Sequence, residues 1–212
     1  GLDGVKTLKE ALEQYSLEHP YSPPDILYKD TDITVLDAHN VSVLACSHLP
    51  LELAFTQARA RGFSVLKIRQ CRQRQLVMGY LARLANRGMN VTAFWRNSQT
   101  PLTEQVIGFR ASSTVPSIRI YAVSELPDEN KANTGITVVM ANHVDLLPTM
   151  RSEYEYDLLA RHDESDLLEV RSKTERDGIT VDTALWEQLQ GLAKLTLVAS
   201  TSSSRLGAGP AD

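Results

Sequence analysis

The sequence predicts an α/β protein built on a mixed, partly parallel sheet with flanking helices. Three observations support this fold class: a strand–helix–strand unit from Phe63 to Trp95, two further apolar strands after it, and a charged, helical C-terminal third. The chain has 212 residues, of which 42% are hydrophobic and 23% charged, as in an ordinary globular protein with one core. We therefore expect a single α/β domain over residues 1–199 and a flexible Ser/Gly-rich tail over 200–212.

Helical and extended patterns alternate in the N-terminal part of the chain. Apolar residues at helical spacing predict a first helix over Asp3–Leu17. Ile33–Leu36 and Val41–Ala45 are β-branched and apolar, which predicts two short strands. A helix is predicted over Leu51–Arg61. Pro50, just before it, suits the first helical position, and Gly62 ends the helix.

The best-defined unit lies between two glycines, Gly62 and Gly88. Phe63–Ile68 is an apolar run typical of a buried strand, Leu76–Asn86 is a predicted helix, and Asn90–Trp95 is a second apolar run. Strand, helix and strand within about thirty residues predict a right-handed βαβ crossover.

The C-terminal half begins extended and becomes helical. Ser117–Val123 and Ile136–Ala141 have strand composition. In the last predicted helix Asp182 is a candidate N-cap. The predicted helices of this half cover Tyr154–Arg161, Asp166–Arg176 and Thr183–Leu192.

Positive charge is concentrated in one segment although the net charge is −4. No Asp or Glu occurs between Leu53 and Thr103, while the rest of the chain has 13 basic and 26 acidic residues. Such a split indicates either an anionic partner or a fold that interleaves the two kinds of segment. The basic residues of the segment are Arg59, Arg61, Lys67, Arg69, Arg72, Arg74, Arg83, Arg87 and Arg96.

Few residues suggest catalysis. The histidines show no metal-ligand spacing, so no metal site is expected. His143 follows a predicted strand end and His39 lies in a predicted turn, which makes them the weak candidates for an acid–base group. Cys71 has arginine neighbours that could lower its pKa. Glycine-rich phosphate loops are absent, and aromatic residues are too sparse in the basic segment to indicate a nucleic-acid module.

Three segments of the chain form a recognisable set of motifs. They are Gly1-Leu2-Asp3-Gly4-Val5, then Ala58–Ile68 with Gly79-Tyr80 and Arg96-Asn97-Ser98, and finally Glu175–Ile179 with Trp186–Leu189. In this order they resemble the sulfolactate/malate/L-lactate dehydrogenase superfamily, whose members are non-Rossmann NAD(P)-dependent oxidoreductases. The whole chain, with its tail Ser204–Gly209, resembles the bacterial family called domain of unknown function 3726.

The resemblance implies the non-Rossmann malate/L-lactate dehydrogenase fold, but with departures at the catalytic positions. The family's first functional histidine has no counterpart between Asp3 and Val5. Counting back from Gly79-Tyr80, its second histidine falls at Arg74, and arginine stays protonated and cannot exchange the hydroxyl proton. The chain is also shorter than these dehydrogenases, so NAD(P) is not expected to bind tightly.

These observations lead to a predicted anion-binding site. If the strands Phe63–Ile68 and Asn90–Trp95 are parallel, the arginines after them leave the same edge of the sheet, where ligands gather in α/β folds. Guanidinium groups bind carboxylates through paired hydrogen bonds. The predicted ligand-binding residues are Arg72, Arg74, Arg96, Asn97 and Ser98.

Three functional hypotheses remain open from sequence. The first is a divergent dehydrogenase-like protein that binds a carboxylate or phosphate without the family's catalytic histidines. The second is an active NAD(P)-dependent 2-hydroxy-acid oxidoreductase with relocated residues, and the third is a non-catalytic interaction subunit. The family resemblance implies a homodimer. We expect a cytoplasmic protein that binds a small anion and neither nucleic acid nor membrane, because Cys46 and Cys71 form no disulfide framework and no apolar run is long enough for a membrane span.

Overall fold

A computed structural model describes residues 5–6, 8–10, 13, 23–97, 103–123, 135–142 and 156–196. The chain divides into two compact units, one of residues 22–173 and one of residues 1–21 and 174–212. The expectation of one domain over residues 1–199 stays a prediction. The predicted tail, 200–212, lies outside the described residues.

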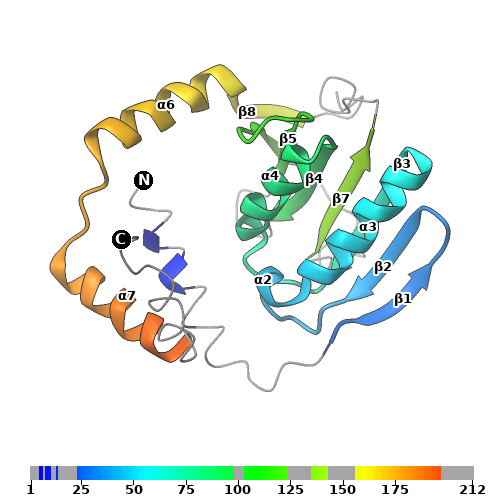
Figure 1. Cartoon of the computed structure of the whole chain (residues 1–212), viewed down its shortest axis with the longest axis horizontal. Helices are drawn as coiled ribbons and strands as arrows, with labels where there is room; N and C mark the ends of the chain where they lie inside the picture. The colour runs from blue at the N-terminus through cyan, green and yellow to red at the C-terminus, as the bar shows by residue number, and fades with distance from the viewer. Residues whose placement is uncertain are drawn as a thin grey trace, which may run out of the picture. The chain divides into compact units, whose positions relative to one another are not determined.

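The unit of residues 22–173 is built on an eight-stranded sheet in the order β1-β2-β3-β7-β4-β5-β6-β8 (Figure 1). Neighbouring strands are antiparallel except β2 and β3, which are parallel, so the predicted mixed sheet is confirmed. The strands are β1 (Asp25–Lys29), β2 (Ile33–Asp37), β3 (Phe63–Arg69), β4 (Asn90–Asn97), β5 (Thr103–Phe109), β6 (Ser117–Val123), β7 (Ile136–Ala141) and β8 (Tyr156–His162).

The predicted strand–helix–strand unit is present, with another strand between its two strands. A 3₁₀ turn (Arg74–Val77) and helix α4 (Met78–Asn86) connect β3 to β4. Both strands pair antiparallel with β7, which lies between them. They therefore run in the same direction, and their carboxyl ends share one edge of the sheet with the start of β7.

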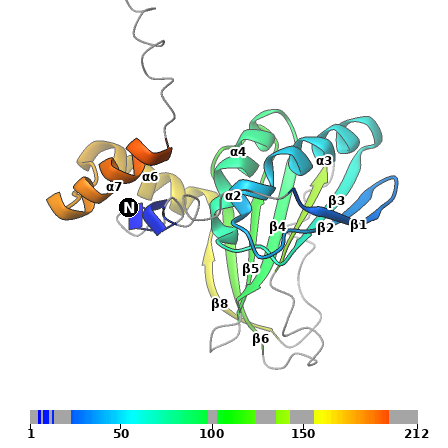
Figure 2. The same cartoon turned by 90° about the horizontal axis from the view of Figure 1, so that it is seen from below.

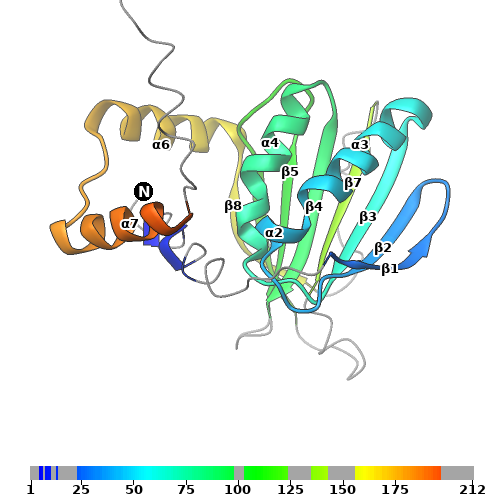
Figure 3. The same cartoon turned by 60° about the horizontal axis from the view of Figure 1, so that its bottom comes forward.

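Helices cover one face of the sheet. Figures 2 and 3 show α2 (Val43–Cys46), α3 (His48–Arg61) and α4 on the same side of the strands. The Ser64 hydroxyl donates to the carbonyl of Ala54 in α3 at 2.8 Å, and Leu66 and Ile68 are fully buried. Because side chains alternate along a strand, Val65 and Lys67 point to the opposite face.

The helix α3 ends as predicted and begins earlier. Gly62 has φ 91°, and its N–H donates to the carbonyl of Ala58, which is the left-handed cap that glycine favours. The helix starts at His48, so Pro50 is its third residue and not its first. Proline is still tolerated there because the N–H groups of the first turn have no partner within the helix.

Two predicted elements were wrong and two strands were missed. Val41–Ala45 was expected to be a strand, but the carbonyl of Ser42 accepts from the N–H groups of Ala45 and Cys46, which starts α2. Tyr154–Arg161 was expected to be a helix, but its described part belongs to β8 because it pairs with β6. Tertiary pairing here outweighs the helix propensity of Leu, Ala and Arg. The strands β1 and β5 had not been predicted.

Helices at both ends of the chain agree with the sequence. Residues 5, 6, 8–10 and 13 are helical, as the first predicted helix requires. Helix α6 (Glu164–Asp177) covers the range expected for it. Helix α7 (Thr183–Thr196) begins after Asp182, whose Oδ1 accepts from the N–H of Leu185 at 2.7 Å. No helix in the described residues is long and apolar enough to cross a membrane.

Candidate functional site

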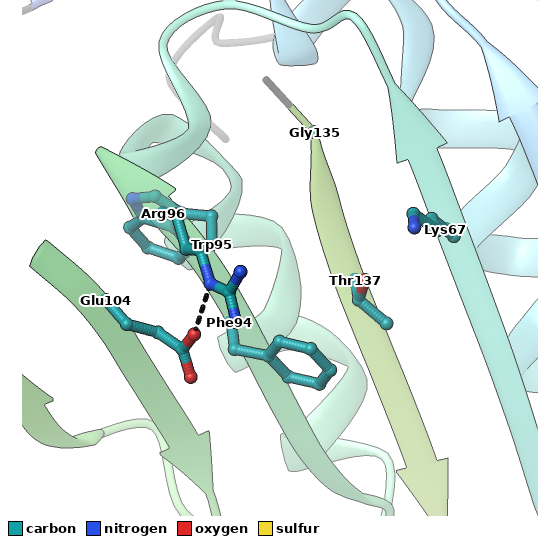
Figure 4. A pocket seen from close by; sticks show the side chains of 7 residues that line it. All are labelled: Lys67, Phe94, Trp95, Arg96, Glu104, Gly135 and Thr137. Atoms are coloured by element: carbon teal, nitrogen blue, oxygen red, sulfur yellow. Dashed lines mark hydrogen bonds and ion pairs between the residues drawn. The ribbon is translucent and has the colours of Figure 1, made fainter. Parts of the chain in front are cut away.

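A pocket of about 260 Å³ opens on the sheet face that lies away from α3 and α4. It sits at the edge where β3 and β4 end and β7 begins. Figure 4 shows its charged side chains in front of the strands and the helices behind them. The pocket is lined by Lys67, Phe94, Trp95, Arg96, Glu104, Gly135 and Thr137.

The strand register places these side chains together. Lys67 in β3 lies opposite Thr137 in β7, and Thr137 lies opposite Phe94 in β4. Two residues further along β4, Arg96 lies opposite Glu104 in β5. Residues that share a row across a sheet point to the same face, so one cation comes from each side of β7.

The pocket has an excess of positive charge. The Nε of Arg96 donates to Oε2 of Glu104 at 2.8 Å, and this half-buried pair fixes the direction of the guanidinium. The Lys67 ammonium is half-buried and forms no hydrogen bond or ion pair with another described residue. Two cations and one carboxylate give the lining a net charge of about +1, which favours an anion.

Gly135 lines the pocket at the start of β7. A Cβ atom at this position would lie 2.5 Å from the carbonyl oxygen of Ile68 and 3.1 Å from the Cα of Arg69. The start of β7 therefore approaches the end of β3 so closely that only glycine fits.

Of the predicted ligand-binding residues that the structure describes, Arg96 lines this pocket, and Arg72, Arg74 and Asn97 do not. Arg72 forms an isolated parallel bridge with Ser42 after the end of β3, and Asn97 is the last residue of β4. Ser98 lies outside the described residues. Lys67 was not predicted as a site residue, although it is a single charged residue inside the apolar run Phe63–Ile68, and that pattern was the available signal.

Arg74 begins the 3₁₀ turn before α4. Its guanidinium is half-buried and makes no hydrogen bond or ion pair with the described part of the chain. Burial lowers the pKa of Arg74. An arginine nevertheless stays protonated at neutral pH, so a cation stands where the family resemblance places a histidine.

His39 is held between two strands. Its Nε2 lies 3.0 Å from Oδ2 of Asp25 at the start of β1, and its Nδ1 lies 3.8 Å from Oδ1 of Asp37 at the end of β2. The residue has φ 51°, a left-handed conformation. With a carboxylate at each ring nitrogen, His39 is placed to join β1 to β2. His143, the other weak catalytic candidate, lies outside the described residues.

Cys71 does not have the low pKa that its arginine neighbours suggested. The side chain is buried, and burial raises the pKa of the Cys71 thiol to about 11, which outweighs the opposite effect of Arg74. A thiol protonated at neutral pH is a poor nucleophile. Cys46 is buried as well, and both cysteines are free.

Acidic residues from outside the basic segment neutralise part of it. Arg87 contacts both Glu52 oxygens at 2.8 and 2.9 Å, and Arg61 lies 3.5 Å from Asp32. Arg96 likewise pairs with Glu104. Folding thus brings acidic residues next to several arginines of the basic segment. Lys67 and Arg96 also bring positive charge into the pocket. No group of three or more His, Cys, Asp or Glu in the described ranges is arranged to hold a metal ion.

Comparison with known proteins yields structural matches only. No protein-family model and no curated protein matches the sequence. Among solved structures, malate dehydrogenase from Pyrococcus horikoshii matches with a TM-score of 0.52 at 12% identity, over 92% of this chain and 86% of that one. The Δ1-piperideine-2-carboxylate reductase from Pseudomonas syringae pvar. tomato gives 0.54 at 13%, over 90% and 88%. Sulfolactate dehydrogenase from Methanocaldococcus jannaschii gives 0.50 at 12%, over 93% and 87%.

This chain has the malate/lactate dehydrogenase-like fold. The expectation drawn from the resemblance is confirmed at the level of fold. The matched regions cover 86%, 88% and 87% of these three neighbours' chains. A strongly shortened chain was expected to cover a smaller share. The names of the neighbours differ in substrate, so the fold does not identify the ligand of this chain.

The pKa of Cys71 predicts how stability depends on alkaline pH. The folded-state pKa lies above the ordinary value of 9.0, so the folded state holds the thiol proton more tightly than the unfolded chain. This contribution to the free energy of unfolding is fully present below about pH 9 and is lost as the pH rises through about 11. Urea unfolding at a series of pH values should show a shallower alkaline loss for Cys71→Ala than for the wild type. Equal slopes for the two proteins would contradict the buried, protonated thiol.

Proposed function

We propose that this chain is a divergent malate/L-lactate dehydrogenase-like protein that binds a small anion, carried by a carboxylate or phosphate group, and does not use the family's histidine pair. We assign it to the domain of unknown function 3726 family on its sequence resemblance. The observation that carries the proposal is the pair of cations, Lys67 and Arg96, on either side of Gly135. The other predicted ligand residues, Arg72, Arg74, Asn97 and Ser98, remain candidates for the same edge of the sheet.

The chemistry of the pocket supports an anion. Lys67 supplies an ammonium with no partner among the described residues, and Glu104 orients the Arg96 guanidinium from behind. Thr137 adds a hydroxyl between them. Charge-assisted hydrogen bonds to carboxylate or phosphate are the strongest that such side chains make.

An active oxidoreductase is the second candidate, and the dehydrogenase-like fold favours it. The pocket does not fit the dinucleotide that this chemistry needs, because about 260 Å³ is below the roughly 300–1,000 Å³ typical of sites for drug-sized ligands. His39, a weak candidate for a relocated acid–base group, faces carboxylates at both ring nitrogens. We derive no hydride transfer from this site.

We further propose that two copies associate through β1, in the cytoplasm, where two free thiols remain reduced. All five β1 residues are exposed, and β1 is the first strand of the sheet, with Ile26 and Tyr28 63% and 51% exposed. Antiparallel pairing of two β1 strands, with the irregularity at Leu27 in the centre, would bring Asp25 of each copy, which also contacts His39, near Lys29 of the other. Opposite charges directly across a strand pair favour pairing.

Loss of either pocket cation should weaken anion binding. We expect a carboxylate, sulfonate or phosphate from a calorimetric panel to bind the wild type, and Arg96→Ala or Lys67→Ala to weaken that binding about tenfold or more, as the loss of a charged hydrogen bond implies. Arg59→Ala is the matched control, because Arg59 is exposed on α3 and lies outside the pocket. If no anion binds, or if the pocket variants bind like Arg59→Ala, the proposed site is wrong.

The assembly proposal predicts a dimer that a charge at the centre of β1 disrupts. Light scattering at micromolar concentration should give a dimer mass for the wild type and a monomer mass for Leu27→Lys, since two lysines would then face each other. Leu53→Lys, an equally exposed leucine on α3, should stay dimeric. A monomeric wild type would refute the assembly.

A further inference from the structure

An aromatic ring lines the charged pocket. Phe94 is half-buried in the row that joins Lys67 and Thr137, and its ring lies on the same side of Thr137 as the Arg96 side chain (Figure 4). A simple phosphate or carboxylate needs hydrogen-bond donors and gains little from an apolar surface. A ligand that carries a ring of its own would gain by packing against Phe94.

We propose that the pocket binds an aromatic carboxylate with a single ring and a second oxygen substituent on the far side of that ring. This inference rests on the proposed anion-binding function and names the ligand class of the same site. The carboxylate binds Arg96, the ring packs against Phe94, and the far oxygen reaches Lys67 and Thr137.

The spacing of the cations supports a ligand with two polar ends. Lys67 and Arg96 belong to strands on either side of β7, which lie roughly 10 Å apart at about 4.8 Å for each strand step, and Arg96 lies two residues further along. A ligand ring with polar groups at opposite positions contacts both cations, one at each end. The volume of about 260 Å³ accommodates one ring.

The ring of Phe94 should also make the pocket prefer a ligand with an aromatic ring over one with a saturated ring. Aromatic rings gain from offset or edge-to-face contact beyond the area they bury, an effect that corresponds to roughly 3- to 10-fold in affinity. A saturated ring with the same substituents keeps both polar ends and loses this contact. The comparison of the two ligands therefore isolates the role of Phe94.

Calorimetry with 4-hydroxybenzoate and trans-4-hydroxycyclohexanecarboxylate tests the inference. We expect the wild type to bind the aromatic acid roughly 3- to 10-fold more tightly. Phe94→Leu should bind both acids equally, and Phe94→Tyr, which keeps the ring, should retain the preference. Phe63→Leu is the matched control, because Phe63 is exposed at the other end of β3 and lies outside the pocket.

The possible failures are distinguishable. If both acids bind equally to the wild type and Arg96→Ala weakens both, the anion site stands and the aromatic preference is wrong. If Phe94→Leu keeps the preference, the ring of Phe94 is not its cause and the inference is overturned. If neither these acids nor any anion of the panel binds, the proposed function itself fails and the inference fails with it.

Discussion

The insertion of β7 between β3 and β4 is the constraint on which the rest of the molecule depends. β3 and β4 run in the same direction because α4 crosses between them, and an antiparallel β7 completes the hydrogen bonds of both. Helices can then cover only one face, since α3 and α4 are connected to the same strands on the same side. The pocket forms on the other face, where the start of β7 meets the ends of its neighbours.

The charge of the pocket follows from this arrangement. Most pairings in the basic segment are made at the edges and among the helices, as Arg87 with Glu52 and Arg61 with Asp32 show. Lys67 and Arg96 instead project from central strands beside a glycine, and the nearest described carboxylate, Glu104, is bound to Arg96. The two strands that adjoin β7 therefore bring two cations to the pocket, and β5 supplies one carboxylate.

Much of the fold could be predicted from the sequence, because short stretches of residues determine the helix ends and the apolar strands. Gly62 capped α3, Asp182 capped α7, and the apolar runs of β3, β4 and β7 were recognisable. The pairing of β8 with β6 and the position of β7 between β3 and β4 depend on distant residues and left no local pattern. For the same reason Arg96 was predicted as a site residue while Lys67, Phe94 and Glu104 were not: their proximity comes from strand order.

The close approach of β7 to the end of β3 is tested most directly by the free energy of unfolding of Gly135→Ala. A Cβ 2.5 Å from the Ile68 carbonyl must push the two strands apart, so we expect a loss of roughly 1–3 kcal/mol in urea unfolding. Gly79→Ala is the matched control: its Cβ would meet nothing within 4 Å in α4, and it should be neutral or more stable by about 0.5–1 kcal/mol. A Gly135→Ala protein as stable as Gly79→Ala would contradict the arrangement of β3, β7 and β4.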